Sequence, residues 1–425
     1  MNTAEFKDSP LGPIPQDWEV KRLGDLCEKI GSGATPLGGA SSYCQTGIAL
    51  IRSQNVVDTR FSFDGLAYIN SDQADELSNV EVLSKDVLLN ITGDSVARVC
   101  TVPDSALPAR VNQHVCILRT IAKKCHCLYL AYRLVVEKKR LLAAAFGGGT
   151  RNALTKADVE AFTIPCPPLP EQQRIAEALG EVDKLIESLD AQIEKKRLIA
   201  KGVAHDLLSA KKRLPGFKGE WKSVRLGAIG ELYGGLSGKT ADDFGHGTAR
   251  YITFLNVLNN VTIDKDMVGE VDVRFGEKQH VVRKGDLFFN VSSETPEEVA
   301  MCAALMEDMP NTYLNSFCCG FRLNKPDHNP LFISYYFNSN IGRDALRGIA
   351  SGITRYNLSK KAFREKMLVW PEYSEQHAIA EVLSEMDASI AVLEEKREKY
   401  TRIKDGMMRD MLTGKVRLKG ECDDK

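Results

Sequence analysis

The chain has 425 residues, of which 56 are Lys or Arg and 57 are Asp or Glu, so its formal net charge is −1. This balance excludes a uniformly basic protein that coats nucleic acid through bulk charge, although it permits local basic grooves. Hydrophobic residues make up 43% of the chain, an ordinary share for a globular protein with two or three cores.

The composition also predicts where the chain resides. No apolar run approaches the roughly 18 residues that a membrane span requires, and the N-terminal segment lacks the layout of a signal peptide, so we expect a cytoplasmic protein. The 11 cysteines have no framework spacing, and most lie in apolar runs, such as Cys100 and Cys318, which predicts reduced, buried thiols. The Cys125-His126-Cys127 segment lacks a second ligand pair, so no zinc site is expected.

In chain order, a Pro- and Gly-rich lead-in precedes Trp18, where a first globular segment begins. The apolar octet KDVLLNIT starts at Lys85 and predicts a buried strand. A glycine-rich loop with Thr150-Arg151-Asn152 follows, and then the short run Phe162-Thr163-Ile164 is closed by prolines. These features predict a mixed α/β globule of about 150 residues.

The second half of the chain repeats these features in the same order. Trp221 matches Trp18 at an offset of 203 (221 − 18), and GDLFFNVS from Gly285 matches the apolar octet. Arg355 matches Arg151 at an offset of 204 (355 − 151). Two copies of one unit half a chain apart predict two related domains. The loops between the shared strands differ, which predicts two related binding surfaces with different specificities.

Each half ends in a long helical pattern. After Pro170, apolar or small residues recur at alternating spacings of four and three, which is a heptad seam. A helix of about 39 residues would be about 58 Å long, and it must lie against an equally long partner. The second copy supplies that partner, with Arg397 and Lys404 interrupting its seam. The expected residues for helix pairing and partner docking are Ile175, Leu179, Val182, Ile186, Leu189, Ile193, Ile379, Leu383, Met386, Ile390, Leu393 and Tyr400.

Four features together resemble one known family. They are the GxTRxxL loops at 148–154 and 352–358, the proline-bounded strands, the EQxxIAxxL helix starts at 171–179 and 375–383, and the twofold repeat. In order and spacing they resemble the specificity subunits of type I restriction-modification systems, over essentially the whole chain. The departures are modest: the second copy has PEYSEQ where the first has PPLPEQ, and these bear on the symmetry of the two halves.

The resemblance implies an α+β fold, with two α/β target-recognition domains separated by two long antiparallel helices that form a coiled-coil-like spacer. The implied segments are a lead-in at 1–17, target-recognition domains at 18–168 and 213–371, spacer helices at 169–212 and 372–413, and a tail at 414–425.

The resemblance also implies a function. Each domain would recognise one half of a bipartite target in double-stranded DNA, while the helices set the spacing and dock methyltransferase subunits, of which two are expected. Restriction or translocase subunits would complete the assembly. The chain itself would be non-catalytic and hold no cofactor, and S-adenosylmethionine would bind to the partner methyltransferase.

Enzymatic patterns in the residues are weak. An amino-methyltransferase requires an Asn/Asp-Pro-Pro-aromatic loop, but Pro167-Pro168 is followed by Leu169. The run from Gly234 to Thr240 is one residue short of a P-loop, so a turn is the better interpretation. A nuclease pattern from Pro103-Asp104 with Glu137 and Lys139 arises easily by chance in a chain with this many charges.

Binding chemistry remains, and the candidates lie in glycine-bounded loops, where Arg, Asn, Gln, Ser and Thr suit base edges and phosphates. Arg151 and Arg355 occur in both halves, so we expect them to contact the DNA backbone or the framework, and Asn112 has a turn-capping alternative. The candidate DNA-binding residues are Arg98, Arg110, Asn112, Gln113, Arg151 and Asn152 in the first half, and Arg250, Tyr251, Ser293, Thr295, Arg355, Tyr356 and Asn357 in the second.

A second hypothesis comes from another class: a structural adaptor that joins protein partners through its paired helices. Binding of the purified chain to mixed-sequence duplex, with an affinity that falls as salt rises, distinguishes the two.

Overall fold

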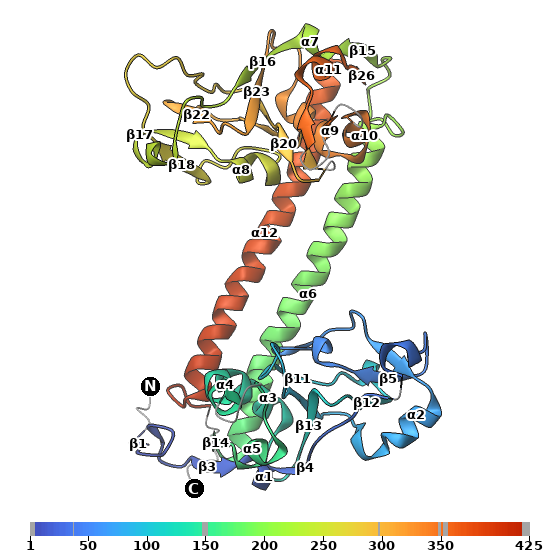
Figure 1. The fold of residues 1–425 in the computed structure, drawn as a ribbon, viewed down its shortest axis with the longest axis vertical. Helices are drawn as coiled ribbons and strands as arrows, with labels where there is room; N and C mark the ends of the chain where they lie inside the picture. Colours follow the sequence, from blue (N-terminus) through green and yellow to red (C-terminus); the bar gives the residue numbers. More distant parts are fainter. Residues whose placement is uncertain are drawn as a thin grey trace. The chain divides into compact units, whose positions relative to one another are not determined.

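The computed structural model (Figure 1) describes residues 5–36, 38–146, 152–295, 298–346, 350–351 and 356–418. The chain forms two compact units. Unit 1 takes the residues up to Asp190 together with those from Lys396 onward, and unit 2 runs from Ala191 to Glu395. The division falls inside both long helices, so each unit contains a globular part and a stretch of each helix. Each unit buries hydrophobic clusters of its own.

The elements up to the first long helix are β1 (Phe6–Lys7), β2 (Ile14–Pro15), β3 (Glu19–Arg22), α1 (Leu23–Leu26), β4 (Cys27–Ser32), β5 (Ile48–Ile51), β6 (Val56–Val57), β7 (Arg60–Phe61), β8 (Ala67–Ile69), α2 (Ser71–Glu76), β9 (Glu81–Val82), β10 (Val87–Asn90), β11 (Val99–Thr101), β12 (Ala109–Val111), β13 (Val115–Thr120), α3 (Cys127–Val136), α4 (Lys138–Phe146), α5 (Lys156–Ala161), β14 (Thr163–Cys166) and α6 (Leu169–Leu208).

The elements after it are β15 (Lys222–Arg225), α7 (Leu226–Ile229), β16 (Gly230–Gly234), β17 (Phe244–Ile252), α8 (Phe254–Asn259), β18 (Val268–Val271), β19 (Leu287–Asn290), β20 (Ser292–Ser293), β21 (Cys302–Ala304), β22 (Thr312–Leu314), β23 (Cys318–Leu323), α9 (Pro330–Asn338), α10 (Asn340–Leu346), β24 (Ala350–Ser351), β25 (Tyr356–Leu358), α11 (Lys360–Glu365), β26 (Met367–Trp370) and α12 (Tyr373–Leu412).

The two units share one sheet topology. In unit 1, β11, β10, β13 and β4 form an antiparallel sheet in that order, and unit 2 repeats it as β21, β19, β23 and β16. A parallel pair also recurs, as β5 with β12 and as β17 with β22. The antiparallel pair β3–β14 of unit 1 returns as β15–β26 of unit 2. The repeat predicted from the sequence is therefore a repeat of fold, and the mixed α and β character is confirmed.

The predicted central strands are buried, and each is entered through a paired aspartate. Residues 87–89 are fully inaccessible, as their unbroken apolar run predicts. Asp86 accepts two hydrogen bonds from Arg119, at 2.9 and 2.8 Å, and Asp286 accepts two from Arg322, at 2.8 and 2.6 Å. An unpaired buried carboxylate is costly. Each arginine is therefore needed to stabilise the aspartate that precedes the buried strand.

The cysteines lie where the apolar runs predicted them. Every cysteine in the described ranges is a free thiol, and most are buried. Burial raises the pKa of the Cys100 thiol to about 12, and it does the same for Cys116. These side chains therefore remain protonated and act as small hydrophobic groups.

Both long helices begin at a buried Glu-Gln pair. The amide of Gln172 accepts a hydrogen bond from the N-cap backbone N–H of α3 (2.9 Å) and donates one to the carbonyl of Pro167 (2.9 Å). Gln376 repeats both bonds, to the N-cap backbone N–H of α9 (2.9 Å) and the carbonyl of Pro371 (2.9 Å). The repeated glutamine therefore ties the start of each long helix to the shorter helix packed beside it.

The repeated glutamate binds an arginine that follows the other long helix. In unit 1, Arg417, beyond the end of α12, donates to both oxygens of Glu171, at 2.6 and 2.7 Å, and the indole N–H of Trp18 donates to the same carboxylate at 3.0 Å. In unit 2, Arg213, beyond the end of α6, binds Glu375 through both its Nε and Nη2 atoms. Each unit thus joins the beginning of one long helix to the end of the other.

The two helices run antiparallel within each unit. In unit 1, Asp183 pairs with Lys404 at 2.5 Å. Asp190, about two turns further along α6, pairs at 2.9 Å with Arg397, which lies earlier in α12. These two cations are the polar interruptions of the second seam, and the structure explains them as ion pairs with the facing helix. In the described part of the chain, neither these helices nor any other is long and apolar enough to cross a membrane.

Unit 2 holds its helices together in the same sense. Leu207 and Leu208, near the end of α6, share a hydrophobic cluster with Ile379 and Leu383, near the start of α12. Further along, Arg197 of α6 binds a glutamate of α12 (2.6 Å). All the predicted seam residues are buried or half-buried in the unit to which they belong: Ile175, Leu179, Val182, Ile186, Leu189, Ile193, Ile379, Leu383, Met386, Ile390, Leu393 and Tyr400.

Candidate nucleic-acid interface

A chain of polar side chains lies on the surface of unit 1, next to the ends of β10 and β12. The hydroxyl of Thr35 donates to the amide oxygen of Gln113, and the amide nitrogen of Gln113 lies 3.1 Å from Nε2 of His114. An amide nitrogen can only donate, so Nε2 accepts and Nδ1 of His114 carries the proton toward Thr92 Oγ1, 2.5 Å away. We call Thr35, Thr92, Gln113, His114 and Asn152 the unit 1 polar cluster.

Backbone hydrogen bonds hold three separate segments together beneath this cluster. The N–H of Ile91 donates to the carbonyl of His114 (3.0 Å), and the N–H of Leu154 donates to the carbonyl of Ile91 (2.8 Å). The N–H of Gly93 also donates to the carbonyl of Asn152 (3.2 Å). The segments after β10, after β12 and before α5 therefore meet at one place, because their main chains pair there.

Unit 2 has the same framework at the equivalent place. The N–H of Val291 donates to the carbonyl of Phe317 (3.0 Å), and the N–H of Leu358 donates to the carbonyl of Val291 (2.9 Å). Strand β20 pairs with β25, which places Ser293 opposite Tyr356. The unit 2 polar cluster is taken from the segments that meet at this place, and it comprises Ser292, Ser293, Thr295, Ser316, Phe317, Tyr356 and Asn357.

A glycine brings the first loop of each unit close to this framework. A Cβ atom on Gly33 would lie 1.8 Å from the carbonyl oxygen of Val111, and one on Gly235 would lie 2.1 Å from that of Asn315. No side chain fits in either gap, so both positions require glycine for the approach. Gly235 belongs to the stretch that resembles a P-loop, and Lys239 of that stretch pairs with Glu277 (2.7 Å), which agrees with a structural turn.

The framework is shared, but the side chains that it presents differ. Gln113 and His114 of unit 1 stand where unit 2 has Ser316 and Phe317, at an offset of 203 (317 − 114). The Phe317 ring is 55% exposed although it is a large apolar group. Unit 1 therefore presents a hydrogen-bonding chain at the position where unit 2 presents an apolar ring.

Three of the predicted residues of the first half lie in or beside the unit 1 polar cluster. Gln113 and Asn152 belong to it, and Arg98 is half-buried in the loop between β10 and β11, whose beginning contributes Thr92. Asn112 is buried beneath the cluster, where its side-chain oxygen accepts the N–H of His114 (3.0 Å). Asn112 therefore caps a turn, which is the alternative role considered for it from the sequence.

Arg110 does not lie at the cluster surface. It is 7% exposed, and its guanidinium donates to the carbonyl oxygens of Ala74 (3.1 Å) and Ala109 (3.0 Å) and lies 3.4 Å from Glu81. These bonds secure α2 and β9 against β12. A buried guanidinium with internal partners is a scaffold group, so we leave Arg110 out of the proposed contact set.

The predicted residues of the second half fall in two places. Ser293, Thr295, Tyr356 and Asn357 come together in the unit 2 polar cluster, although Ser293 is buried and donates to Glu298 (2.8 Å). Arg250 and Tyr251 lie on β17. The Arg250 side chain is exposed, while Tyr251 packs edge-on against Phe244 (5.0 Å between ring centroids). Arg151 and Arg355 lie outside the described residues.

Several members of the clusters are not among the residues predicted from the sequence. Thr35, Thr92 and His114 are joined in unit 1 by side-chain hydrogen bonds between distant segments. His114 could have been found from its repeat position, because it follows the matched Asn112 by two residues, as Phe317 follows Asn315. Among the residues that the structure describes, no group of three or more His, Cys, Asp and Glu side chains is placed to hold a metal ion.

Comparison with known proteins shows what this architecture is similar to. Residues 15–196 and 218–402 each match the model of the type I restriction modification DNA specificity domain. A putative type I restriction enzyme MjaX specificity subunit of Methanocaldococcus jannaschii is 23% identical over 446 residues, which cover 97% of each chain. The EcoKI specificity subunit of Escherichia coli is 21% identical over 425 residues, covering 91% of this chain and 85% of that one.

Solved structures agree at the level of the fold. The crystal structure of a type I restriction-modification system S subunit from M. genitalium matches with a TM-score of 0.60 at 15% identity, over 96% of this chain and 98% of that one. A second match, from a structure of a type I R-M system described for its complex assembly and conformational transition, has a TM-score of 0.53 at 16% identity. It covers 95% of this chain and 99% of that one.

Proposed function

Because this chain belongs to the type I restriction modification DNA specificity domain family, we propose that each of its units recognises one part of a bipartite sequence in double-stranded DNA. The single observation that carries the proposal is the pair of polar clusters. One backbone framework, repeated in both units, presents Gln113 and His114 in unit 1 and Ser316 and Phe317 in unit 2. A protein that reads two different half-sites with one fold requires this combination.

The side chains suit the chemistry of DNA. Gln113 and Asn152 offer amide groups that can donate to and accept from base edges, and Phe317 offers an apolar face for a thymine methyl group. Arg98 and Arg250 supply positive charge for phosphates, which positions the protein without selecting a sequence. We also propose backbone contacts for Arg151 and Arg355, since both units carry them within the same motif.

The long helices are proposed to dock methyltransferase subunits, with restriction or translocase subunits in the full complex. Because the seam residues are buried or half-buried, we propose that exposed helix residues supply most of the docking surface, rather than the seam residues predicted from the sequence. In unit 2, Leu198 of α6 and Val392 of α12 are 62% and 64% exposed. We propose that these two exposed apolar side chains are part of the surface that a methyltransferase subunit covers.

The chain is proposed to be non-catalytic by itself. Methyl transfer would require the partner methyltransferase and its S-adenosylmethionine. The purified chain, assayed with radiolabelled S-adenosylmethionine and with divalent metals, is expected neither to methylate nor to cleave DNA. Methyl transfer that copurifies with the isolated chain through a final gel-filtration step would refute this part of the proposal.

The DNA proposal is tested by selecting preferred targets from a random library with three proteins: the unmodified chain, His114→Ala and Phe317→Ala. We expect His114→Ala to relax base preference in one half-site only, and Phe317→Ala to do so in the other, each with a loss of about 5- to 50-fold in specific affinity. Each variant is the control for the other. Affinity should also fall steeply as salt rises.

Two results would contradict the proposal. If both variants changed the same half-site, the two units would not recognise separate sequences. If the chain failed to bind duplex DNA at low salt while still binding a methyltransferase subunit, the structural adaptor hypothesis would replace DNA recognition.

A further inference from the structure

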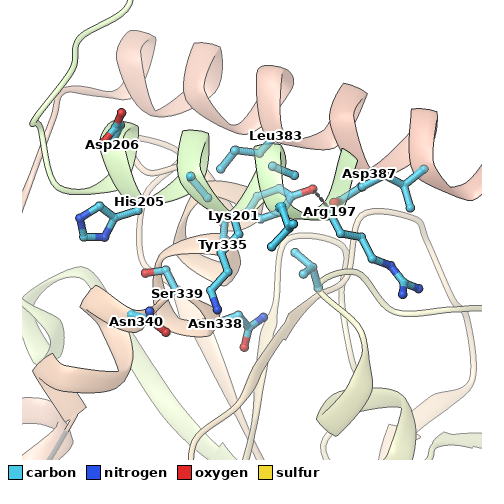
Figure 2. Close-up of a pocket in the computed structure, with 16 residues that line it drawn as sticks. Arg197, Lys201, His205, Asp206, Tyr335, Asn338, Ser339, Asn340, Leu383 and Asp387 are labelled. Atoms are coloured by element: carbon cyan, nitrogen blue, oxygen red, sulfur yellow. Dashed lines mark hydrogen bonds between the residues drawn. The ribbon is translucent and has the colours of Figure 1, made fainter. Parts of the chain in front are cut away.

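A pocket of about 750 Å³ lies in unit 2 among α6, α12 and the C-terminal end of α9 (Figure 2). Figure 2 shows Leu383 and Asp387 of α12, Lys201 and His205 of α6, and Asn338 around it. Its apolar walls include Leu198, Ala200, Leu383 and Ile390. Charged and polar side chains line the rest of it, among them Lys201, Asp206 and Asp387. A volume in the range of roughly 300 to 1,000 Å³ is typical of a ligand site.

One wall of this pocket carries a carboxylate that is only partly satisfied. The hydroxyl of Tyr335 donates to Oδ2 of Asp387 at 2.6 Å (Figure 2). Burial, and then this bond to Asp387, raise the pKa of Tyr335, so the phenol remains protonated and continues to donate. Asp387 itself is exposed on the pocket wall, and it forms no ion pair with any part of the chain that the structure describes.

Unit 1 has the same pair, and there the carboxylate is neutralised by a lysine. The hydroxyl of Tyr132 donates to Oδ2 of Asp183 at 2.6 Å, while Nζ of Lys404 lies 2.5 Å from Oδ1 of the same carboxylate. The Lys404 ammonium also donates to the hydroxyl of Thr59 (3.0 Å) and lies 5.5 Å from the centre of the Tyr132 ring. Lys404 is only 7% exposed, so its alkyl stem is packed inside unit 1.

The repeat shows which residue replaces this lysine in unit 2. Helices α6 and α12 each have 40 residues and begin 204 positions apart (373 − 169), so each α6 residue corresponds to the α12 residue 204 later. Lys404 therefore corresponds to Ala200, and the buried Met408 corresponds to Ala204. Both alanines line the pocket. The hollow of unit 2 is thus the place that unit 1 fills with a lysine and a methionine.

We propose that this pocket binds a primary alkylammonium group, with the ammonium at Asp387 and the alkyl stem against Tyr335 and Leu383. The group would reproduce what Lys404 supplies in unit 1: a charge for the carboxylate, a cation close to a tyrosine ring, and methylenes for an apolar wall. A lysine side chain of a bound protein and a free linear amine share this chemistry.

Two cations of α6 lie on the same pocket wall. The Arg197 guanidinium is engaged with Glu394 (2.6 Å). Lys201 is exposed, and within the described residues it makes no ion pair with Asp387. In solution Lys201 can compete for the carboxylate, so its removal should favour an external ammonium.

The first experiment titrates the full chain with 1-aminopentane and, as the neutral control, with 1-pentanol, using calorimetry or saturation-transfer NMR. We expect saturable binding of the amine and at least about tenfold weaker binding of the alcohol. Asp387→Asn should weaken amine binding by at least about fivefold. Glu385→Gln, which removes an exposed carboxylate of the same helix outside the pocket, should leave it unchanged.

Lys201→Met should bind the amine at least as tightly as the unmodified chain. Equal affinity of the unmodified chain and Asp387→Asn for the amine would overturn the proposal, and so would equal affinity for amine and alcohol.

The second experiment places the missing lysine in the chain. Ala200→Lys should raise the melting temperature by about 2–4 °C. Hydrogen exchange of the peptides should show that the gain in stability lies in unit 2. The gain should vanish in the Asp387→Asn background, whereas any gain from Ala200→Met, which adds a stem without a charge, should persist there. Ala200→Lys should also abolish binding of 1-aminopentane. A lysine that stabilised the unit equally with and without Asp387 would contradict the proposal.

A third arm identifies the source of the ammonium, and it rests on the proposed methyltransferase partner. If Asp387→Asn weakens assembly with that subunit and Glu385→Gln does not, the occupant is a lysine of the subunit. If assembly is unchanged while 1-aminopentane still binds, the occupant is a free amine. Because the first two experiments use neither DNA nor a partner, a failure of the proposed function would not be mistaken for a failure of this site.

Discussion

Gln172 and Gln376 show how a single side chain can connect a helix start to the core. Each amide accepts the first backbone N–H of a neighbouring helix and donates to the carbonyl of a proline just before its own helix. Both side chains are almost fully buried. Removing such an amide leaves a buried N–H and a buried carbonyl without partners, and this costs more than one ordinary hydrogen bond contributes.

We therefore predict that Gln172→Leu destabilises unit 1, and Gln376→Leu unit 2, by about 1–3 kcal/mol each. Hydrogen exchange at increasing urea concentration, followed by peptides from each unit, measures the two effects separately. Gln173→Leu and His377→Leu change the exposed neighbours of these positions and should have effects within about 0.5 kcal/mol. An equal loss for the exposed and buried positions would show that the buried amides are not the source of the stability.

Lys404 and Arg110 illustrate how residue type alone can mislead. On sequence grounds Lys404 is a flaw in an apolar seam and Arg110 is a free cation for DNA. In the structure both are almost fully buried, and both are engaged with oxygen atoms of their own unit. Their roles depend on partners that lie 221 (404 − 183) and 36 (110 − 74) positions away in the chain.

At the scale of elements, the two long helices are matched copies. Each has 40 residues, and their cross-helix ion pairs in unit 1 join Asp183 to Lys404 and Asp190 to Arg397. The two residue numbers of each pair have the same sum, 587 (183 + 404 and 190 + 397), as expected of antiparallel helices in register.

If the helices set the distance between the two half-sites, a longer pair should lengthen the gap. Insertion of Ala-Glu-Ala-Leu between Ile193 and Glu194, with the same insertion between Leu393 and Glu394, adds about 6 Å at 1.5 Å per residue. Four residues keep the seam close to its face. We expect unchanged half-sites and a gap that is longer by roughly one or two base pairs, since one base pair rises about 3.4 Å and bending absorbs the remainder.

Selection from a library of random spacer lengths measures this gap directly. The single insertion in α6 serves as an intermediate, and a two-residue insertion at the same points is the control for register. The control should reduce folding, because two residues turn the seam away from the facing helix. A folded four-residue variant that prefers the original gap would show that the helices do not determine the spacing.

At the scale of the whole molecule, the fold of each unit depends on contacts between segments that are far apart in the sequence. Arg417 binds Asp17 at 2.9 and 2.7 Å as well as Glu171, so residues far apart in the chain are neighbours in unit 1. In unit 2, Arg213 takes the corresponding place beside Glu375. In each unit, the start of its own long helix is thus bound by an arginine that follows the end of the other long helix. We refer to this contact as the closure of the unit.

We predict that a circular permutant remains folded and binds DNA when the original termini are joined and the chain is opened between Phe217 and Lys218. This opening leaves Arg213 attached to α6 and Trp221 attached to unit 2. Circular dichroism, gel filtration and a duplex-binding assay check the outcome. As a control, an opening between Leu88 and Leu89, inside a buried strand, should abolish folding. An insoluble first permutant would contradict the closure of each unit by Arg417 or Arg213.

Local patterns in the sequence determined a large part of this protein. Heptad spacing predicted both long helices, apolar octets predicted the buried strands, and the repeated Trp, Thr-Arg and Glu-Gln motifs predicted two copies of one unit. These features depend on neighbours within a few residues, or on the same motif recurring at a constant offset, so they can be recognised without coordinates.

Only the tertiary structure decided which polar side chains are free and which are engaged. The hydrogen-bonded chain from Thr35 to Thr92 joins segments that share no pattern in the sequence. The burial of Arg110 and the hollow at Ala200 were equally hidden, because each depends on side chains that fold in from distant elements. The energy of a polar group is set by its partners and its burial, and these arise only when separate elements pack together.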